Sequence, residues 1–134
     1  MSDAVATSPI EYCTPSNWPA PAGHYSPAAA FGDLIYVSGQ LPDLPQGQPV
    51  SFKAQVESAM QRVFSALASA GGEPKNIIKV TAYLVGVHHW GAFNDTYAAM
   101  MGDHRPARAV VPVPELHHGC LVEIEAIAIR KMRR

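Results

Sequence analysis

The sequence predicts an α+β domain in which two helices cover one face of a mixed sheet. Segments with strand and helix periodicity follow one another in the order strand, helix, strand, helix, strand, strand. This order makes two overlapping βαβ units, which we expect a hairpin of the last two strands to close. Right-handed crossovers then place both helices on the same face. The length of 134 residues predicts one domain over residues 1–134, with residues 1–20 as an irregular N-terminal extension.

Proline dominates the first part of the chain. Eight of the twelve prolines precede residue 50, and proline disrupts helices, so short strands and irregular turns are predicted there. The first clear strand covers residues 34–38, which are rich in β-branched and aromatic side chains and are followed by Gly39. A loop rich in proline and glycine follows over residues 41–50.

The first helix is predicted to begin after Ser51, a favourable N-cap residue, and to end at Gly71–Gly72. Apolar side chains recur at helical spacing along it, at Phe52, Val56, Met60, Val63 and Leu67. A shorter second helix is marked in the same way by Trp90, Phe93, Tyr97 and Met101.

Three further strands are predicted over residues 77–85, 108–113 and 121–129. The side chains of residues 77–85 alternate between two faces of the sheet. We expect one row to hold Ile78, Val80, Ala82 and Leu84, and the opposite row to hold Lys79, Thr81 and Tyr83.

The sheet face without helices must be solvated or packed against something. The outward row of residues 79–85 is mixed rather than fully polar, and only 16% of the residues are charged, against about 25% in a typical soluble domain. Both observations favour packing against other copies of the chain, so we expect a homo-oligomer.

Composition and motifs exclude several classes of function. The net charge of −1 argues against a general nucleic-acid binder. The chain has no signal peptide and no apolar run long enough for a membrane span, which predicts a cytoplasmic protein. The thiols Cys13 and Cys120 form no CxxC pair and are expected to be reduced. The doublets His88–His89 and His117–His118 lack metal-ligand spacing, so no metal site is predicted.

The final strand carries two carboxylates in an otherwise apolar row. Glu123 and Glu125 alternate on one face with Leu121, Ile127 and Ile129. Burial raises the pKa of a carboxyl, as a general acid or base near neutral pH requires. A salt-bridged structural glutamate or an exposed row would have the same spacing.

Arg108 opens the preceding strand and would lie near Glu123 if the last two strands paired. An arginine fork can bind a substrate carboxylate through two parallel hydrogen bonds. It can equally neutralise Glu123 or Glu125, and spacing does not separate the two roles.

Three stretches resemble the Rid family of reactive intermediate deaminases, which are also called YjgF-like proteins or L-PSP endoribonucleases. They are Tyr36-Val-Ser-Gly-Gln-Leu-Pro42, Phe93-Asn-Asp-Thr-Tyr97, and Arg105-Pro-Ala-Arg108 followed by Val122-Glu-Ile-Glu-Ala-Ile-Ala128. The resemblance covers roughly residues 23–130. It implies a chorismate-mutase-like fold and a homotrimer with the bare sheet faces inside and active sites between subunits. The implied reaction, which needs no cofactor, hydrolyses enamines and imines such as 2-aminoacrylate and 2-iminopropionate to a 2-keto acid and ammonia.

The resemblance also implies roles for particular residues. Arg108 matches the carboxylate-binding arginine, and Glu123 matches the glutamate that holds and polarises the attacking water. The remaining matched positions line or shape the substrate cleft, Val110 through its backbone: Tyr25, Ser38, Gly39, Asn94 and Val110.

The chain departs from the family pattern at several places near the expected cleft. His24 stands where proline is usual, Ala109 where a hydroxyl residue is common, and His117–His118 where Pro-Lys is frequent. These departures bear on the pocket mouth and the substrate range. Three other functions are compatible with the residues: an endoribonuclease, a non-enzymatic binder of small carboxylates, and a holdase or regulator of partner proteins. The charge of −1 argues against the first.

Overall fold

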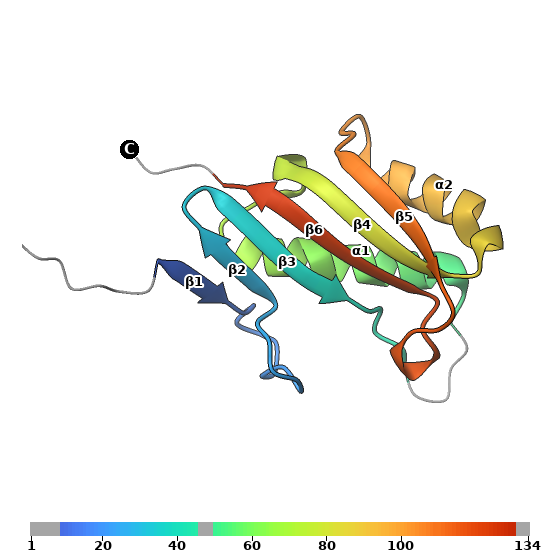
Figure 1. The fold of residues 1–134 in the computed structure, drawn as a ribbon, viewed down its shortest axis with the longest axis horizontal. Coiled ribbons are helices and arrows are strands. Elements are labelled where there is room, and N and C mark those ends of the chain that lie inside the picture. The colour runs from blue at the N-terminus through green and yellow to red at the C-terminus, as the bar shows by residue number, and fades with distance from the viewer. Residues whose placement is uncertain (1–8, 46–49, 131–134) are drawn as a thin grey trace, which may run out of the picture.

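Six strands form a single sheet that two helices cover on one face (Figure 1). The structure is a computed structural model that describes residues 9–45 and 50–130. The strands are β1 (Ile10–Cys13), β2 (Ala28–Phe31), β3 (Leu34–Gln40), β4 (Ile77–Val85), β5 (Ala107–Val113) and β6 (Val122–Ile129). The helices are α1 (Phe52–Ser69) and α2 (Trp90–Met101). The prediction of a mixed sheet with both helices on one face is confirmed.

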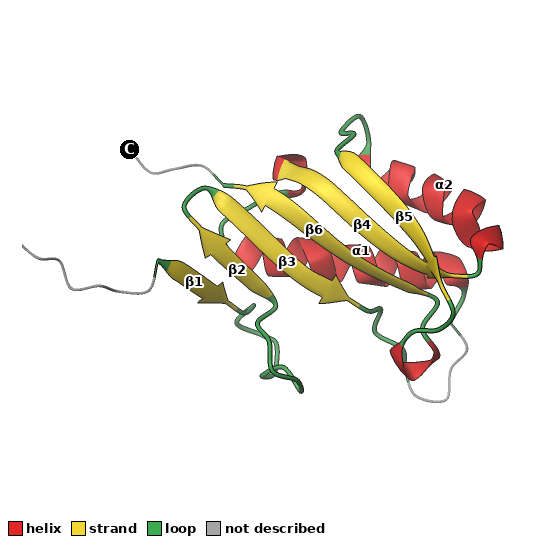
Figure 2. Ribbon diagram, in the orientation of Figure 1, coloured by secondary structure: helices red, strands yellow, loops and turns green. Residues whose placement is uncertain are grey.

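The strand order is β1-β2-β3-β6-β4-β5, so β6 lies between β3 and β4 (Figure 2). It runs antiparallel to both neighbours, whereas β4 and β5 are parallel. The predicted hairpin of the last two strands is therefore wrong. As a central strand, β6 has hydrogen-bonding neighbours on both edges, which a place outside β5 would not have provided.

Most element boundaries agree with the sequence analysis to within two residues. The Ser51 hydroxyl accepts a hydrogen bond from the Ala54 amide at 3.1 Å, which confirms the predicted N-cap of α1. Within residues 1–20, which were expected to be irregular, residues 10–13 form β1 and pair with β2. Part of the predicted loop over residues 41–50, namely 46–49, lies outside the described residues.

The first residues of β4 differ from the predicted alternation. Ile78 was expected to share the buried row of Val80, but its side chain is 45% exposed and Ile77 is buried instead. The pairing of β4 with β6 shifts between Ile77 and Lys79, where β4 contains one extra residue. This bulge reverses the side-chain alternation at the start of the strand.

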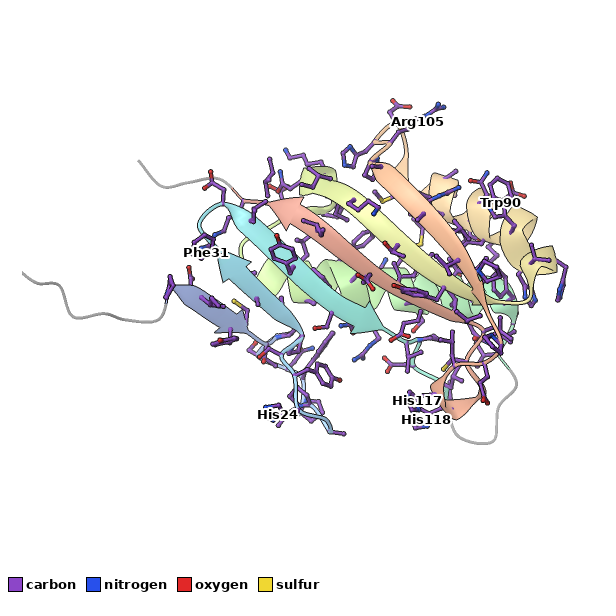
Figure 3. All side chains as sticks on the ribbon, viewed as in Figure 1. His24, Phe31, Trp90, Arg105, His117 and His118 are labelled. Carbon is purple, nitrogen blue, oxygen red and sulfur yellow. The ribbon has the colours of Figure 1, made fainter. Side chains whose placement is uncertain are left out.

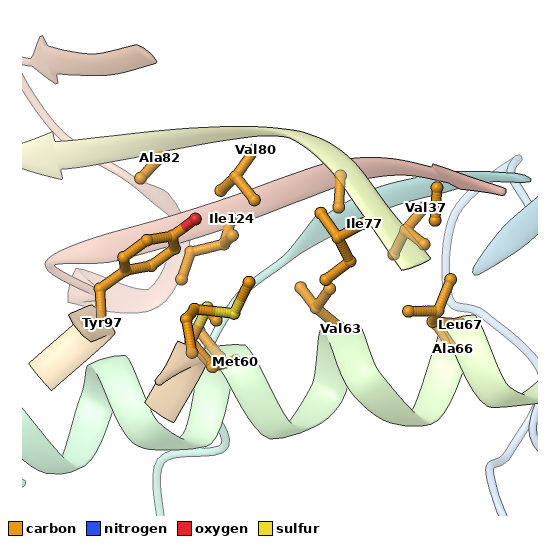
Figure 4. Close-up of a cluster of buried hydrophobic side chains, with 14 of the residues drawn as sticks. Val37, Met60, Val63, Ala66, Leu67, Ile77, Val80, Ala82, Tyr97 and Ile124 are labelled. Atoms are coloured by element: carbon orange, nitrogen blue, oxygen red, sulfur yellow. The ribbon is translucent and has the colours of Figure 1, made fainter. Parts of the chain in front are cut away.

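The hydrophobic core lies between the sheet and the helices (Figure 4). One row of each central strand packs on the inner faces of α1 and α2, and its largest side chains are fully buried: Ile35, Ile77, Val80, Leu84, Val122 and Ile124. On α2, Phe93, Tyr97 and Met101 are buried, whereas Trp90 is 47% exposed. Burial of these rows removes most of the apolar surface of the helices from water, which is the main favourable contribution to folding.

The opposite face of the sheet, called the open face, is not covered by a helix (Figure 1). It carries the alternate side chains of the strands. Several are large and well exposed: Tyr12, Phe31, Tyr36, Val111 and Ile129. An exposed apolar face of this kind is typical of a surface that another molecule covers. Among the described residues, no helix combines the length and the apolar character that crossing a membrane requires.

The Tyr97 hydroxyl gives a test of the core. Tyr97 is 6% exposed, and its oxygen finds no hydrogen-bond partner within the described residues (Figure 4). Tyr97→Phe removes this unpaired group, so the free energy of unfolding should rise by about 1 kcal/mol. Urea unfolding followed by far-UV circular dichroism measures the change.

Tyr83→Phe is the matched control, because the Tyr83 hydroxyl donates a hydrogen bond to Glu125 at 2.8 Å. Its loss should lower the free energy of unfolding by about 1 kcal/mol. A destabilised Tyr97→Phe protein would mean that the buried hydroxyl has a partner.

Candidate active site

Two cavities contain the residues that the sequence singles out. The first, called the Glu123 pocket, has a volume of about 600 Å³. Four of the predicted site residues line it: Tyr25, Ser38, Gly39 and Glu123. The second, called the Arg108 pocket, has a volume of about 370 Å³ and is lined by Arg108 and Asn94 among others. Val110 lines neither cavity.

A bulge in β3 shapes the Glu123 pocket. Between Val37 and Gln40 the strand contains one residue more than the facing segment of β6, and Ser38 and Gly39 lie in this irregularity. A Cβ atom added to Gly39 would lie 2.6 Å from Glu123 Oε2 and 3.0 Å from Glu123 Cδ. The Glu123 carboxyl group thus occupies the space that a side chain at position 39 would take. Bulges of this type often lie beside active sites.

Ser38 fixes the segment that carries Tyr25. The Ser38 hydroxyl donates a hydrogen bond to the Ser26 carbonyl at 2.5 Å, and the Ser38 amide donates to the Pro27 carbonyl at 2.9 Å. These two bonds hold residues 26 and 27 against the end of β3. Tyr25 precedes them and is 55% exposed at the edge of the pocket. Since the hydroxyl proton of Ser38 is used by the backbone, its role here is to position the neighbouring chain.

The two carboxylates of β6 have different surroundings. Glu125 accepts a hydrogen bond from the Tyr83 hydroxyl, which raises the pKa of Tyr83. No hydrogen bond to the Glu123 carboxyl occurs among the described residues. Burial raises the pKa of Glu123; the nearby His117 acts in the opposite direction, and the charge of Glu125 raises it further. Of the two carboxyl groups, Glu123 is thus the one suited to exchanging a proton, whereas Glu125 is fixed by its hydrogen bond to Tyr83.

Arg108 is fixed by α2 rather than by a carboxylate. Its Nη1 donates a hydrogen bond to Asn94 Oδ1 at 3.0 Å. Its Cζ atom lies 4.9 Å from the ring centre of Tyr97 and 5.6 Å from that of Phe93. Cation–π contacts of this kind hold the guanidinium plane. Within residues 9–45 and 50–130, its other N–H groups have no hydrogen-bond partner, and the side chain lines the Arg108 pocket.

Arg108 and Glu123 do not meet within one chain, and the expectation that they lie near each other across paired strands is wrong. β4 separates their strands: Arg108 pairs with Val80, and Glu123 pairs with Tyr83. Three residues along β4 and two strand spacings across it correspond to roughly 10 Å in each direction. Val80 is buried beneath the helices, so Arg108 is on the helix face, whereas Glu123 is on the open face.

The structure therefore divides the predicted site residues into two groups. Tyr25, Ser38 and Gly39 gather around Glu123, while Asn94 holds Arg108. The Val110 side chain packs against the core, on the edge strand β5. No observation assigns a role to its backbone.

Several residues that line the Glu123 pocket were not predicted as site residues, among them the ionisable Asp43, Arg62 and His117. Arg62 on α1 forms an ion pair with Asp43 at 3.1 Å, and its Cζ lies 4.2 Å from the ring centre of Trp18. No local pattern could have revealed this cluster, since it joins three segments that only the fold brings together. His117 had one signal, its place in a histidine doublet shortly before the carboxylates.

Metal-ligating side chains do not gather within the part of the chain that the structure describes. No group of three or more histidine, cysteine, aspartate or glutamate residues comes close enough there to hold an ion. Cys120 is buried, and Cys13 is half-buried and remote from it in the sheet order.

The family model described as Endoribonuclease L-PSP matches residues 15–130 of the chain. The chain is 36% identical over 118 residues to a RutC family protein of Pyrococcus horikoshii, across 86% of this chain and 94% of that protein. It is 32% identical over 136 residues to a 2-iminobutanoate/2-iminopropanoate deaminase of Escherichia coli K12, across 98% of this chain and 100% of that protein. The crystal structure of E. coli TdcF with bound serine matches with a TM-score of 0.81 and 27% identity, across 90% of this chain and 99% of that one.

The raised pKa of Glu123 predicts that this carboxyl lowers stability at neutral pH. Its proton is bound more tightly in the folded state than in the unfolded chain, so the free energy of unfolding falls as pH rises through this window. Glu123→Gln should therefore stabilise the protein at pH 7. The gain should disappear below the pKa of an unfolded glutamate, about 4.3, where both states carry the proton. Urea unfolding at several pH values measures it.

Glu57 on α1 provides the matched control, because it is exposed. Glu57→Gln should change the free energy of unfolding by less than about 0.5 kcal/mol at any of these pH values. A Glu123→Gln protein that is less stable than the wild type at pH 7 would contradict the assignment of burial as the main influence on this carboxyl.

Proposed function

The chain belongs to the endoribonuclease L-PSP family, the Rid or YjgF-like proteins, and from this premise we propose that it hydrolyses small 2-imino acids and their enamine tautomers. The products are a 2-keto acid and ammonia. The observation that carries the proposal is the state of the Glu123 carboxyl. This carboxyl lies in a cavity, its pKa is raised, and it has no hydrogen-bond partner among the described residues. A relative from E. coli K12 that aligns with 98% of the chain is named a 2-iminobutanoate/2-iminopropanoate deaminase, which supports the same reaction class.

Glu123 serves as general base and then as general acid. Its carboxylate takes a proton from a water molecule as the water oxygen attacks the imine carbon. The Glu123 carboxyl returns this proton to the imine nitrogen, so the resulting tetrahedral carbon carries a hydroxyl and an amino group. The carboxylate then takes the hydroxyl proton and passes it to the amino nitrogen as the carbon–nitrogen bond breaks, so that ammonia leaves and the carbonyl forms. A group that both takes and gives a proton works best when its pKa is near the operating pH, and burial raises the pKa of Glu123 in that direction.

Arg108 binds the carboxylate of the substrate. Arg108 lines the Arg108 pocket, and a fork of two parallel hydrogen bonds from its guanidinium would fix both the position and the orientation of a carboxylate. Asn94 and the aromatic rings of α2 hold the guanidinium in place before the substrate arrives. An imine carbon is already electrophilic, so orientation and one activated water supply most of what the reaction needs. No cofactor is part of this mechanism.

A neighbouring subunit completes the site. Since Arg108 and Glu123 lie on opposite faces of the sheet in one chain, the same imine can reach both only if they come from two chains. The apolar side chains of the open face give subunits a surface to associate through. We assign the assembly as a homotrimer in which the open faces lie inside and three clefts join the Arg108 pocket of one subunit to the Glu123 pocket of the next.

The remaining site residues act on the cleft. Tyr25 covers the mouth of the Glu123 pocket, Ser38 holds its segment in place, and Gly39 leaves room for the carboxyl. On the family resemblance alone, we also assign the Val110 backbone to substrate and water; Val110 follows Arg108 by two residues on the edge strand β5. The serine bound by the related TdcF is a small amino acid, which supports a ligand of this size.

RNA cleavage is the second function in view, because the matching family model carries the name of an endoribonuclease. The net charge of −1 and the carboxylates of the open face oppose binding of a phosphate backbone. A non-enzymatic carboxylate binder would use Arg108 equally well, and turnover separates the two.

The proposal predicts that Arg108 is essential for turnover. In a coupled assay, a PLP enzyme generates 2-aminoacrylate from serine, and semicarbazide traps the imine that escapes hydrolysis. The wild-type protein should lower the trapped fraction, and Arg108→Ala should lose activity by roughly 100-fold because the carboxylate loses its anchor. Lys75→Ala, which removes an exposed cation that lines neither pocket, should retain full activity. Full activity of Arg108→Ala would refute the assignment, and RNA cleavage without imine hydrolysis would favour the second function.

The shared site predicts complementation between two inactive variants. Arg108→Ala and Glu123→Gln chains, co-expressed with different tags and purified as mixed assemblies, should recover activity. In trimers that assemble at random from equal amounts, about a quarter of the clefts join an intact Arg108 to an intact Glu123. Arg108→Ala mixed with the double variant should remain inactive, since it contains no intact Arg108. Activity no higher than that of this control would show that each chain forms its site alone.

Sedimentation velocity of the wild-type protein reports whether the assembly is trimeric.

A further inference from the structure

The Arg108 pocket contains more positive charge than one substrate carboxylate requires. Arg105 lines this cavity together with Arg108. Among the described residues, its lining contains no aspartate or glutamate, and neither guanidinium forms an ion pair. The cavity therefore presents two permanent positive charges, although the chain as a whole has a net charge of −1. A cavity lined by charges of one sign concentrates ligands of the opposite sign.

The loop that carries Arg105 joins α2 to β5 and has a fixed backbone (Figure 3). Two amides of this loop donate hydrogen bonds to carbonyl groups of α2, at 3.0 and 3.2 Å. Nε2 of His104 donates to the Ile77 carbonyl at the start of β4, at 2.7 Å. Pro106 follows Arg105, and its ring fixes the φ angle there. Arg105 is thus held at the cavity from both sides along the chain.

The two arginines are suited to different parts of a ligand. Arg108 is half-buried, and Asn94 and the ring of Tyr97 hold its guanidinium in place. It is therefore the anchor for the carboxylate that every 2-imino acid has. Arg105 is exposed, and its guanidinium has no partner in the part of the chain that the structure describes. Its long side chain is free to turn toward a second anionic group that the ligand carries into the cavity.

The dimensions of the cavity fit a short dicarboxylate. Positions 105 and 108 are three residues apart, so their Cα atoms lie at most about 10 Å from each other. Two arginine side chains at this spacing can contact both ends of a diacid of the length of succinate or glutarate. The cavity volume of about 370 Å³ is at the lower end of the range for small-molecule sites. Ala98 and Met101 also line the cavity and offer apolar contact to the carbon chain between the two carboxylates.

We propose that Arg105 is a specificity-determining residue that binds a side-chain carboxylate, so that the preferred substrates are imines of dicarboxylic amino acids. The inference rests on the proposed function for the reaction, because Arg108 is assigned there to the first carboxylate. The hydrolysis itself is unchanged, since the second carboxylate takes no part in bond making or breaking. Oxidation of a dicarboxylic amino acid at its α-carbon is the class of reaction that supplies such an imine.

The first test measures ligand binding without turnover. The 2-oxo acids 2-oxoglutarate and 2-oxopentanoate have the same carbon chain and differ in the second carboxylate. In isothermal titration calorimetry, the wild-type protein should bind 2-oxoglutarate roughly fivefold more tightly, as expected for one solvent-accessible charge pair. In Arg105→Gln the ratio of the two dissociation constants should fall to about 1, because the second carboxylate has lost its partner.

Two further variants are the controls. Lys75→Gln removes an exposed cation that lines neither pocket and should keep the wild-type ratio. Arg108→Ala should weaken the binding of both acids by a similar factor, since both carry the carboxylate next to the oxo group. Equal or absent binding of the two acids by the wild type would overturn the proposal. A wild-type ratio in Arg105→Gln would also overturn it.

The second test separates this inference from the proposed function. A flavin oxidase generates 2-iminosuccinate from D-aspartate or 2-iminopropanoate from D-alanine, catalase removes the peroxide, and semicarbazide traps the imine that escapes hydrolysis. The rate of hydrolysis of 2-iminosuccinate relative to 2-iminopropanoate should fall roughly fivefold in Arg105→Gln. Hydrolysis of both imines with an unchanged ratio would overturn the inference and leave the deaminase function standing. Binding of 2-oxoglutarate that depends on Arg105, without hydrolysis of either imine, would refute the deaminase function and support the dicarboxylate site.

Discussion

The insertion of β6 between β3 and β4 is the constraint on which the rest of the molecule depends. It gives β6 a neighbour on each edge and joins the two βαβ halves into one sheet. One row of β6 fills the core with Val122, Ile124, Ala126 and Ala128, each at most 4% exposed. The other row must then lie on the open face, and it is this row that holds Glu123. The same alternation that stabilises the core thus sets the Glu123 carboxyl on the uncovered side of the sheet.

Several features around Glu123 oppose stability. The carboxyl is partly removed from water without a hydrogen bond among the described residues; β3 is interrupted by a bulge beside it; and His118 adopts a left-handed conformation in the adjacent turn. Each has an energetic cost that the well-packed core offsets. Glu125, by contrast, accepts a hydrogen bond from a tyrosine hydroxyl. The cost of an unpaired carboxyl is therefore confined to Glu123, although the two side chains are chemically identical.

Periodicity was sufficient to locate the elements but not to arrange them. The apolar spacing of α1, its Ser51 cap and the alternation of β4 and β6 are local properties, and they were predictable to within a few residues. Strand order depends on pairing between distant segments, and a terminal hairpin was locally as consistent as the central place of β6. The bulge at Ile78 could not be predicted for the same reason.

For the site, spacing put two glutamates on one face, and family resemblance selected Arg108 and Glu123. Only the register of β4 with both of its neighbours shows that Arg108 and Glu123 lie on opposite faces of the sheet. The Asp43–Arg62 pair could not be inferred, since its partners are nineteen positions apart in different segments.

The setting of Arg108 has a practical side. Its guanidinium is held by an amide oxygen and aromatic rings, with no carboxylate counter-ion in the part of the chain that the structure describes. An uncompensated cation at a cavity attracts any small anion in the medium, and phosphate and sulfate fit the same donor fork as a carboxylate. Buffer composition therefore becomes an experimental variable, because phosphate retained from purification would compete with an organic carboxylate for the guanidinium of Arg108. Amine buffers with chloride at low concentration are the conditions in which the affinity of this pocket for organic acids can be compared between preparations.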